Sequence, residues 1–480
     1  MTKKITLVQS LIPVVALITM LAYNVLFVYN SPDDDVLAGS NQFVLLMGGV
    51  IGVLVGMYLK IPFRVMTNQV FENIKSTGGA ILILLMVGAL SGTWLISGII
   101  PSMIFYGLKI LNPTLFLAAC VIICALISIA TGSSWTTSAT IGIALMGIGD
   151  TLGIPLGMTA GAVISGGYFG DKMSPMSDTT NLASAMAGTD IFTHIRYMTL
   201  TTVPTLAISL LIFLIIGFNL PTDITTDTAL IEQAISKEFD TNPLLFVVPL
   251  LILIMVVRKV DPLIALMAGA LLGGVFAIIF QPDIVRNIAN SQTLTFNSAY
   301  RGVMEALTTP ISVKTDDAYL SELFTSKGMS GMLNTIWLII CAMVFGGIME
   351  AIGALERITQ SLLTMFHSIF GLFASTIVSC LALNITASDQ YLSIVVPGKM
   401  FAEAYKKKGL APENLSRTLE DSATVTSVLI PWNTCAAYNS GVLGVPTLAY
   451  LPYAFFNLIS PFMTLLFAAF RIKIKMLISK

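Results

Sequence analysis

Long apolar stretches follow one another along most of this chain, separated by short polar segments. A helix needs about 20 apolar residues to cross the hydrocarbon core of a bilayer. Runs of about this length lie at residues 5–29, 39–59, 77–100, 195–217, 243–257, 262–280, 330–353 and 447–470. The pattern therefore predicts an all-α integral membrane protein with many spans.

Two further apolar segments are interrupted by polar residues. The first covers residues 154–190 and is broken around Met173–Asp178, at a Ser-Pro step followed by hydroxyl and charged groups. The second covers residues 414–445 and is broken around Pro431–Thr434. Lipid cannot hydrogen-bond a freed backbone, so a broken helix survives at bilayer depth only against protein or a wet cavity. A duplicated broken helix is typical of the binding site of a secondary transporter.

Two more apolar segments, residues 113–150 and 369–404, each carry polar residues at their middle. These polar residues lie at Thr131–Ser134 in the first segment and at Asn384–Asp389 in the second. Each segment is either one long span with a break or a re-entrant hairpin with the polar residues at its tip.

The distribution of charge favours two hairpins. Basic loops of membrane proteins lie in the cytoplasm. With two hairpins, Arg258 and Lys259 fall on the same side as Lys3 and Lys4 at the N-terminus, and the acidic loop 219–242 falls outside. With two full spans, these positions would be reversed. We therefore expect re-entrant hairpins, and both termini in the cytoplasm.

The hairpins make the two halves of the chain inverted repeats. Each repeat holds about five spans with one hairpin and one broken helix, so the second repeat begins on the opposite side of the membrane. We assign residues 1–218 to the first repeat, 219–242 to an external linker and 243–480 to the second repeat, which contains an external insertion with a short helix at 281–329. The spacing of the breaks supports duplication, since Gly92 to Thr131 and Gly347 to Thr386 are both 39 residues apart.

Composition agrees with a membrane protein. The chain of 480 residues is 55% hydrophobic and 11% charged, whereas soluble domains carry about 25% charged residues. The net charge of −1 gives no reason to expect nucleic acid as a partner. The run from Ile5 to Tyr29 is too long for the apolar core of a signal peptide, so it predicts a first span. We expect a multi-pass protein of the cytoplasmic membrane, with no cofactor.

The polar interruptions carry chemistry suited to a small hard cation. Carbonyls freed at helix breaks coordinate cations, and hydroxyl and carboxylate oxygens are hard ligands. The two hairpin tips and the two broken helices supply such oxygens. Glu420 and Asp421 are further acids of the second half. A carboxylate removed from water also binds a proton more readily. A carboxylate that holds either Na⁺ or H⁺ is the minimum requirement for exchange.

These same motifs resemble a known family. The segment GGYFGDKMSPMSDTTNLAS, residues 166–184, resembles the signature of NhaC-type sodium/proton antiporters, and ATGSSWTTSATIG and PWNTCAAY are similar to other segments of that family. The resemblance covers about residues 40–470. It implies inverted repeats with paired hairpins and broken helices that meet at a midplane site. It also implies ion-site roles for Asp171, Ser174, Asp178, Thr179 and Asn181. Relatives with this motif include exchangers of organic acids such as malate and lactate, and amino-acid carriers.

We predict an antiporter that exchanges Na⁺ for H⁺, with Na⁺ at Asp178, Thr179 and Ser134. Asp178 is the first choice for the carboxylate shared by Na⁺ and H⁺, and Asp389 is the second. The candidate ion-binding residues are Thr131, Ser133, Ser134, Asp171, Ser174, Asp178, Thr179, Asn181, Thr386, Ser388, Asp389, Asp421, Asn433 and Thr434. The partners would be Na⁺, H⁺ and membrane lipid. An organic acid or an amino acid as an additional substrate is the main alternative, and a homodimer is left open.

Several of these residues have structural alternatives. A hydroxyl in a membrane helix often bonds its own helix, as Thr136 could. Asp389 could cap a helix at the hairpin tip. Lys172 could neutralise an anionic substrate, but a structural pairing with Asp171 is the better reading.

Two other classes of protein compete with a transporter. Gly147–Asp150 matches the GxGD sequence of intramembrane aspartyl proteases. Such an enzyme needs a second aspartate that shares a proton with the first, and the Tyr-Asp motif that supplies it is missing from the chain. A channel is disfavoured because paired broken helices are typical of alternating access. We therefore expect no enzymatic activity.

Overall fold

The structure is a computed structural model that describes residues 4–28, 39–110, 112–220, 228–315, 318–365 and 368–477. The helices of the first half are α1 (Leu7–Tyr23), α2 (Ser40–Tyr58), α3 (Phe63–Ser76), α4 (Gly78–Ile96), α5 (Ile99–Ile110), α6 (Pro113–Thr131), α7 (Ser134–Thr137), α8 (Ile143–Thr151), α9 (Leu156–Met173), α10 (Asp178–Ala187) and α11 (Ile191–Asn219).

The second half begins with α12 (Thr228–Glu238), α13 (Val247–Val257), α14 (Pro262–Phe280), α15 (Pro282–Ile288), α16 (Phe296–Thr308) and α17 (Ala318–Leu323). Two short strands, β1 (Ile311–Ser312) and β2 (Thr325–Ser326), pair antiparallel around α17. The helices that follow are α18 (Leu333–Ala351), α19 (Ala354–Met365), α20 (Ile369–Thr386), α21 (Gln390–Lys407), α22 (Pro412–Leu419), α23 (Val425–Ser427), α24 (Thr434–Leu443), α25 (Thr447–Tyr450) and α26 (Phe455–Ala469).

The helices confirm an all-α membrane protein. Within the described ranges, seven helices are long and apolar enough to cross a membrane, and two bent pairs raise the number to nine if each pair is one span. The single helices are α2, α4, α6, α11, α14, α18 with the turn before it, and α20. The chain is therefore a multi-pass membrane protein.

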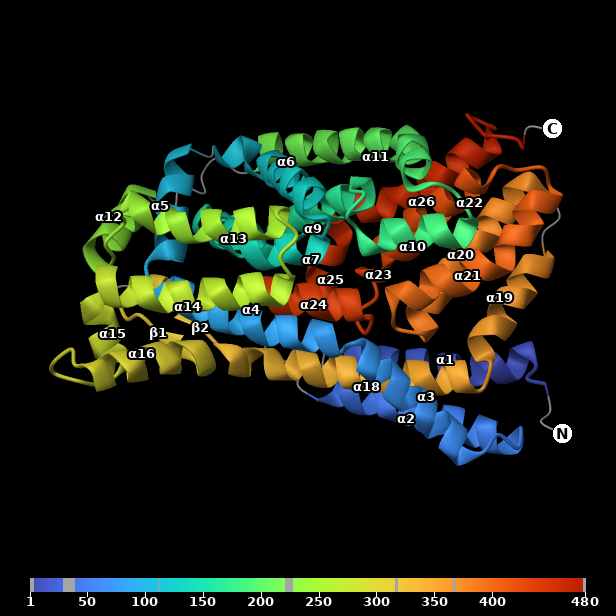
Figure 1. Cartoon of the computed structure of the whole chain (residues 1–480), viewed down its shortest axis with the longest axis horizontal. Helices are drawn as coiled ribbons and strands as arrows, with labels where there is room; N and C mark the ends of the chain where they lie inside the picture. Colours follow the sequence, from blue (N-terminus) through green and yellow to red (C-terminus); the bar gives the residue numbers. More distant parts are fainter. Residues whose placement is uncertain are drawn as a thin grey trace.

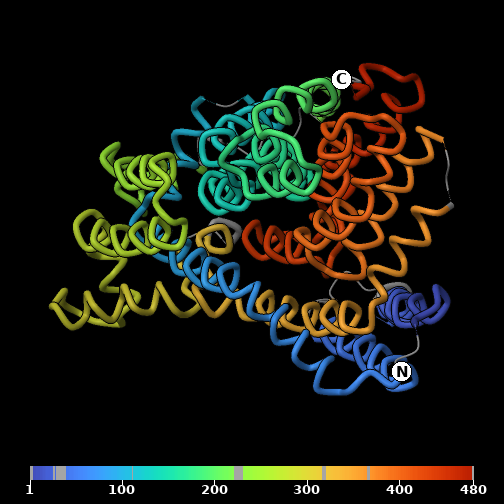
Figure 2. Tube along the Cα trace, turned by 45° about the vertical axis from the view of Figure 1, so that its right-hand side comes forward, coloured from blue at the N-terminus to red at the C-terminus, as the bar shows by residue number. Residues whose placement is uncertain are grey.

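Helices from both halves of the chain are mixed in two groups. In one group, α4 lies beside α14 and α16, and α18 lies beside α2 and α3. In the other group, α6 packs on α9 and α11, and α11 lies beside α26 (Figure 1). Figure 2 shows the teal and green segment of the first half next to the orange and red segment of the second. The two halves therefore share their packing surfaces.

In each of the two segments predicted as hairpins, the two helices fold back so that they lie close together away from the tip. At the end of α8, a Cβ on Gly149 would lie 3.0 Å from the ring of Phe116 near the start of α6. In the second half, Thr376 near the start of α20 and Tyr405 near the end of α21 lie 3.2 Å apart through their hydroxyl oxygens. Glycine permits the first reversal, because Gly132 at the tip has a φ of +73°, which side chains rarely adopt.

Close packing of α6 against α9 holds the first hairpin on the first broken helix. A Cβ on Gly166 would lie 2.3 Å from the carbonyl oxygen of Val121, and one on Gly170 would lie 2.4 Å from Cβ of Ser128. Only glycine leaves room for this approach. Ser128 also donates a hydrogen bond to the carbonyl of Gly167 at 2.6 Å. The polar end of α9 is thereby held beside the hairpin tip.

The connecting segments contain more structure than the sequence indicated. The acidic segment 219–242 contains α12, and the insertion 281–329 contains three helices and two strands where one short helix was expected. The helix α3 was also not anticipated. A search for long apolar runs misses such helices, because their apolar positions recur on one face only.

Candidate functional site

The first broken helix ends and restarts around Pro175. The helix α9 ends at Met173, and Ser177 caps the start of α10 by accepting from the backbone N–H of Thr180. The side chain of Asn181 donates to the carbonyls of Pro175 and Ser177 at 2.9 and 2.8 Å. Asn181 therefore stabilises the conformation of the break.

The second broken helix is joined to the second hairpin tip. A π-helical segment, Glu420–Thr424, leads into α23, and Asn433 caps the start of α24. The side-chain amide of Asn433 donates to the carbonyl of Asn384 at 3.2 Å. The backbone N–H of Thr434 donates to the carbonyl of Ser388 at 3.0 Å. These bonds fix the tip against the break.

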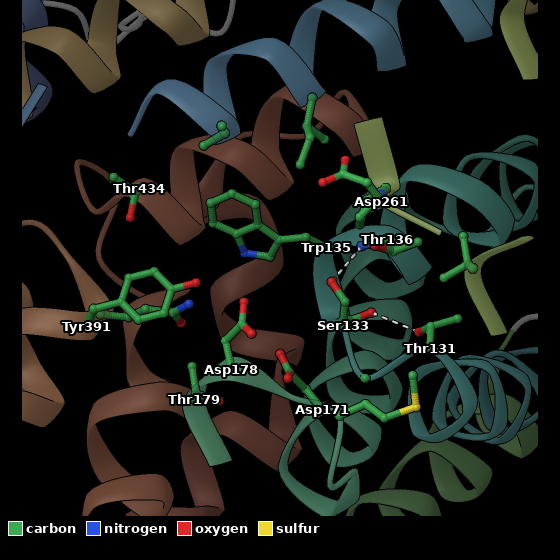
Figure 3. Close-up of a pocket in the computed structure, with 18 of the residues that line it drawn as sticks. Thr131, Ser133, Trp135, Thr136, Asp171, Asp178, Thr179, Asp261, Tyr391 and Thr434 are labelled. Atoms are coloured by element: carbon green, nitrogen blue, oxygen red, sulfur yellow. Dashed lines mark hydrogen bonds between the residues drawn. The ribbon is translucent and has the colours of Figure 1, made fainter. Parts of the chain in front are cut away.

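The two hairpin tips and the two breaks surround one cavity of about 440 Å³. Seven predicted site residues line it, namely Thr131, Ser133, Asp171, Asp178, Thr179, Asp389 and Thr434. Figure 3 shows Asp171 and Asp178 directed into this cavity below the ring of Trp135. Residues more than 300 positions apart in the chain thus face the same space.

Asp171 is nearly buried and is held by hydroxyl groups. Its side chain is 8% exposed. Ser134 donates to Oδ2 through its hydroxyl at 2.7 Å and through its backbone N–H at 3.3 Å. Ser177 donates to Oδ1 at 2.5 Å. A carboxylate that accepts several such bonds is stabilised in its charged form.

Asp178 and Thr179 lie in the first turn of α10 and line the cavity. Asp178 is exposed, and its carboxylate forms no hydrogen bond or ion pair with any described residue. Thr179 is buried, and its hydroxyl lies 3.1 Å from the hydroxyl of Ser177. The expected sodium ligands Asp178, Thr179 and Ser134 thus come close to the same space, with Ser134 behind Asp171.

Asp389 has both of the properties considered for it. It caps α21, since its carboxylate accepts from the backbone N–H of Leu392 at 2.9 Å. It also lines the cavity, where it is 8% exposed. Capping and ion binding are therefore compatible at this position.

The cavity is acidic overall. Its lining contains the carboxylates of Asp171, Asp178, Asp261 and Asp389 and one cationic side chain, Lys259. Such a surface attracts cations and disfavours anions.

Lys172 faces away from this cavity. Its ammonium group is completely buried and forms an ion pair with Asp421, which also accepts from the hydroxyls of Thr201 and Thr464 at 2.8 and 2.5 Å. The expected pairing of Lys172 with Asp171 is wrong, because consecutive residues of a helix point in different directions.

Five further predicted residues do not line the cavity. Ser174 and Asn181 belong to the first break, whereas Thr386, Ser388 and Asn433 belong to the second tip and break. Thr386 donates to the carbonyl of Ala382 within its own helix at 2.7 Å. These residues shape the site without direct access to the cavity.

Several lining or contacting residues were missed from the sequence. Trp135 and Tyr391 line the cavity, and Trp135 stacks on Tyr438 with ring centroids 4.2 Å apart. Aromatic residues are too common in membrane helices to single these out. Ser177 could have been found, since a serine directly before Asp-Thr-Thr at a helix start is a capping signal.

Comparison with known proteins bears on this arrangement. The profile of the Na⁺/H⁺ antiporter family matches residues 166–472, a range that includes the break in each of the two broken helices. The chain belongs to this family. This antiporter-family chain is 37% identical over 418 residues to the Na⁺/H⁺ antiporter NhaC of Alkalihalophilus pseudofirmus, and the match covers 87% of each chain.

Two relatives from Bacillus subtilis are similar to this antiporter-family chain. The malate-2H⁺/Na⁺-lactate antiporter is 34% identical over 425 residues, covering 87% of each chain. The Na⁺/H⁺ antiporter NhaC is 35% identical over 413 residues, covering 85% of this chain and 88% of the relative. The resemblance predicted from the three sequence motifs is confirmed.

Proposed function

We propose that this protein is a secondary transporter that exchanges Na⁺ for H⁺ by alternating access. The observation that supports this most is the convergence of Asp171, Asp178 and Asp389 on one cavity bounded by both hairpin tips and both helix breaks. Membership of the Na⁺/H⁺ antiporter family supports the same pair of ions.

The chemistry of exchange needs only one carboxylate that holds either ion. A Na⁺ ion at Asp171 would meet hydroxyl oxygens, which are hard ligands. A proton on the same carboxyl group removes the charge that offsets the dehydration of Na⁺. The two ions therefore exclude one another, and their gradients become coupled.

One lining residue supports an assignment of the side on which the cavity opens. Lys259 at the cavity comes from the connection that also holds Arg258 and is expected to be cytoplasmic, as basic connections are. We assign the structure to an inward-facing state on this basis, with both termini in the cytoplasm.

An organic acid as an additional substrate is the second candidate. The malate-2H⁺/Na⁺-lactate antiporter of Bacillus subtilis, similar over most of the chain, supports it. The four carboxylates of the cavity weigh against an anion at this position, and Lys172 is committed to Asp421. Na⁺/H⁺ exchange without an organic acid therefore ranks first.

An intramembrane protease ranks far behind both transporters. Asp150 lines a different cavity of about 590 Å³, and no second aspartate is among the described residues that line it. A pair of aspartates sharing a proton is the requirement for that chemistry.

Transport in proteoliposomes tests the proposal. Under an imposed Na⁺ gradient, we expect internal pH to change with Na⁺ flux. We expect no Na⁺-dependent transport of labelled malate or lactate. Acid movement that depends on the Na⁺ gradient would favour the second candidate. Absence of any Na⁺-dependent change in internal pH would refute antiport of these two ions.

A further inference from the structure

We propose that Ser177 is a direct ligand of the transported Na⁺ and determines the selectivity of the site. This inference rests on the proposed Na⁺/H⁺ exchange and extends it to a residue that was not among the candidates from the sequence. Its basis is the position of the Ser177 hydroxyl, which lies between Asp171 and Thr179.

The contacts of Ser177 place it in a group of oxygens from three segments. Its hydroxyl lies 2.5 Å from Oδ1 of Asp171 and 3.1 Å from the hydroxyl of Thr179. Across the same carboxylate, the hydroxyl of Ser134 lies 2.7 Å from Oδ2. The end of α9, the start of α10 and the first hairpin tip therefore each present oxygen atoms around Asp171. Such a set of hard oxygens suits a small hard cation.

Ser177 differs from the hydroxyls that line the cavity, because it lies outside the lining. Ser177 is completely buried and is not part of the cavity lining, whereas Thr179 and Asp171 are. An ion at Asp171 can keep water on its cavity side but meets Ser177 on its protein side. Ser177 therefore supplies an oxygen whose position is fixed by the fold, and fixed oxygens select an ion by size.

Capping alone does not account for the position of this hydroxyl. Its distance to the backbone nitrogen of Thr180 is 3.5 Å, which is long for a cap, while its bond to Asp171 is short. Ser184 on the same helix offers a comparison. It is buried as well, but among the described residues its hydroxyl bonds only the carbonyl of Asn181, at 2.8 Å.

The experiment measures binding of ²²Na⁺ to the purified, detergent-solubilised full chain at alkaline pH, with Li⁺ and K⁺ as competitors. For Ser177→Ala we expect Na⁺ affinity to fall about tenfold, the effect of losing one oxygen ligand to a charged group, and Li⁺ and Na⁺ to be discriminated less. Ser177→Thr keeps the hydroxyl and should bind within about twofold of the wild type. Ser184→Ala is the matched control and should bind as the wild type does.

Ser177→Asn separates the two roles of the residue. Asparagine caps helices as well as serine does, but its longer side chain moves the oxygen away from Asp171. We expect this variant to keep the thermal stability of the wild type and to lose Na⁺ affinity as Ser177→Ala does. Wild-type affinity and selectivity in both Ser177→Asn and Ser177→Ala would overturn the inference.

Failure of this inference is distinguishable from failure of the proposed function. If the wild type exchanges Na⁺ for H⁺ while Ser177→Ala and Ser177→Asn bind Na⁺ normally, only the role of Ser177 is refuted. Wild-type protein that neither binds ²²Na⁺ nor couples it to internal pH removes both.

Discussion

Lys172 pairs with Asp421, a residue of the other half of the chain, although its sequence neighbour Asp171 points into the cavity. Both partners are completely buried. The pair joins α9 to the π-helical segment of the second broken helix, and Thr201 of α11 and Thr464 of α26 complete the shell around Asp421. Four elements beside the site are thus held by one buried charge pair.

We expect Lys172→Met to reduce the amount of folded protein before it affects ion binding. Removing the lysine leaves Asp421 buried without a counter-charge, which typically costs about 3–5 kcal/mol. Thermal unfolding in detergent measures the loss. The double variant Lys172→Met with Asp421→Asn removes both charges and should recover part of the stability. A single variant as stable as the wild type would contradict this role.

Neutralising either cavity carboxylate of the first break should remove coupling. In Asp171→Asn or Asp178→Asn, an amide replaces the group that can hold a proton, so the Na⁺ affinity of the coupling residue should lose its pH dependence. In the wild type, competition at one carboxylate requires Na⁺ affinity to improve about tenfold per pH unit at low pH and then to level off. Binding of ²²Na⁺ between pH 5 and pH 9 identifies which carboxylate is shared. Tenfold pH dependence retained in both variants would place the coupling residue elsewhere, with Asp389 next.

Asp389→Asn should destabilise the fold less than Asp389→Ala does. Asp389→Asn keeps an oxygen that can accept from the backbone of Leu392, whereas Asp389→Ala loses the cap of α21 and should be destabilised by about 1 kcal/mol. Thermal unfolding of both variants compares them. We also expect Asp389→Asn to weaken Na⁺ binding several-fold, since the cavity loses one of its carboxylates. Unchanged binding would restrict Asp389 to capping.

The hairpin geometry predicts the side of the membrane on which its ends lie. In a background without the native cysteines, cysteines at Asn112 and Asp150 should both react with an impermeant thiol reagent added outside. Asn112 caps the start of α6, and Asp150 lies in the last turn of α8. Labelling of the two positions from opposite sides would remove the inverted-repeat arrangement.

Much of the fold was predictable because apolar length and polar interruption are strong signals in a membrane protein. Helices end at Thr131 and Thr386 and restart at Ser134 and Gln390, and two further helices are broken near Pro175 and Pro431, where the sequence indicated. Lipid cannot solvate a free backbone, so these polar residues had to meet one another or water. Amphipathic connections such as α3 carry no such signal and were missed.

Pairings between side chains were less predictable than positions. Lys172 follows Asp171 directly, which favoured a local pair, but the partner is Asp421, 249 residues away. Charge along the sequence does not say which face of α9 each residue occupies until the packing of α9 is known. The exposure of Asp178 also depends on the fold, because the break opens on a cavity.

The hydroxyl of Ser177 carries only one proton, so the protonation state of Asp171 decides in which direction Ser177 donates it. When Asp171 is charged, the single proton of Ser177 is donated to it, so Ser177 presents only lone pairs to Thr179 or to an arriving cation. When Asp171 holds a proton, the carboxyl group donates to Ser177, and the proton of Ser177 turns toward Thr179 or the cation. The direction of this short relay thus offers an arriving cation either lone pairs or a proton. Na⁺ and H⁺ can therefore exclude each other while bound to different atoms.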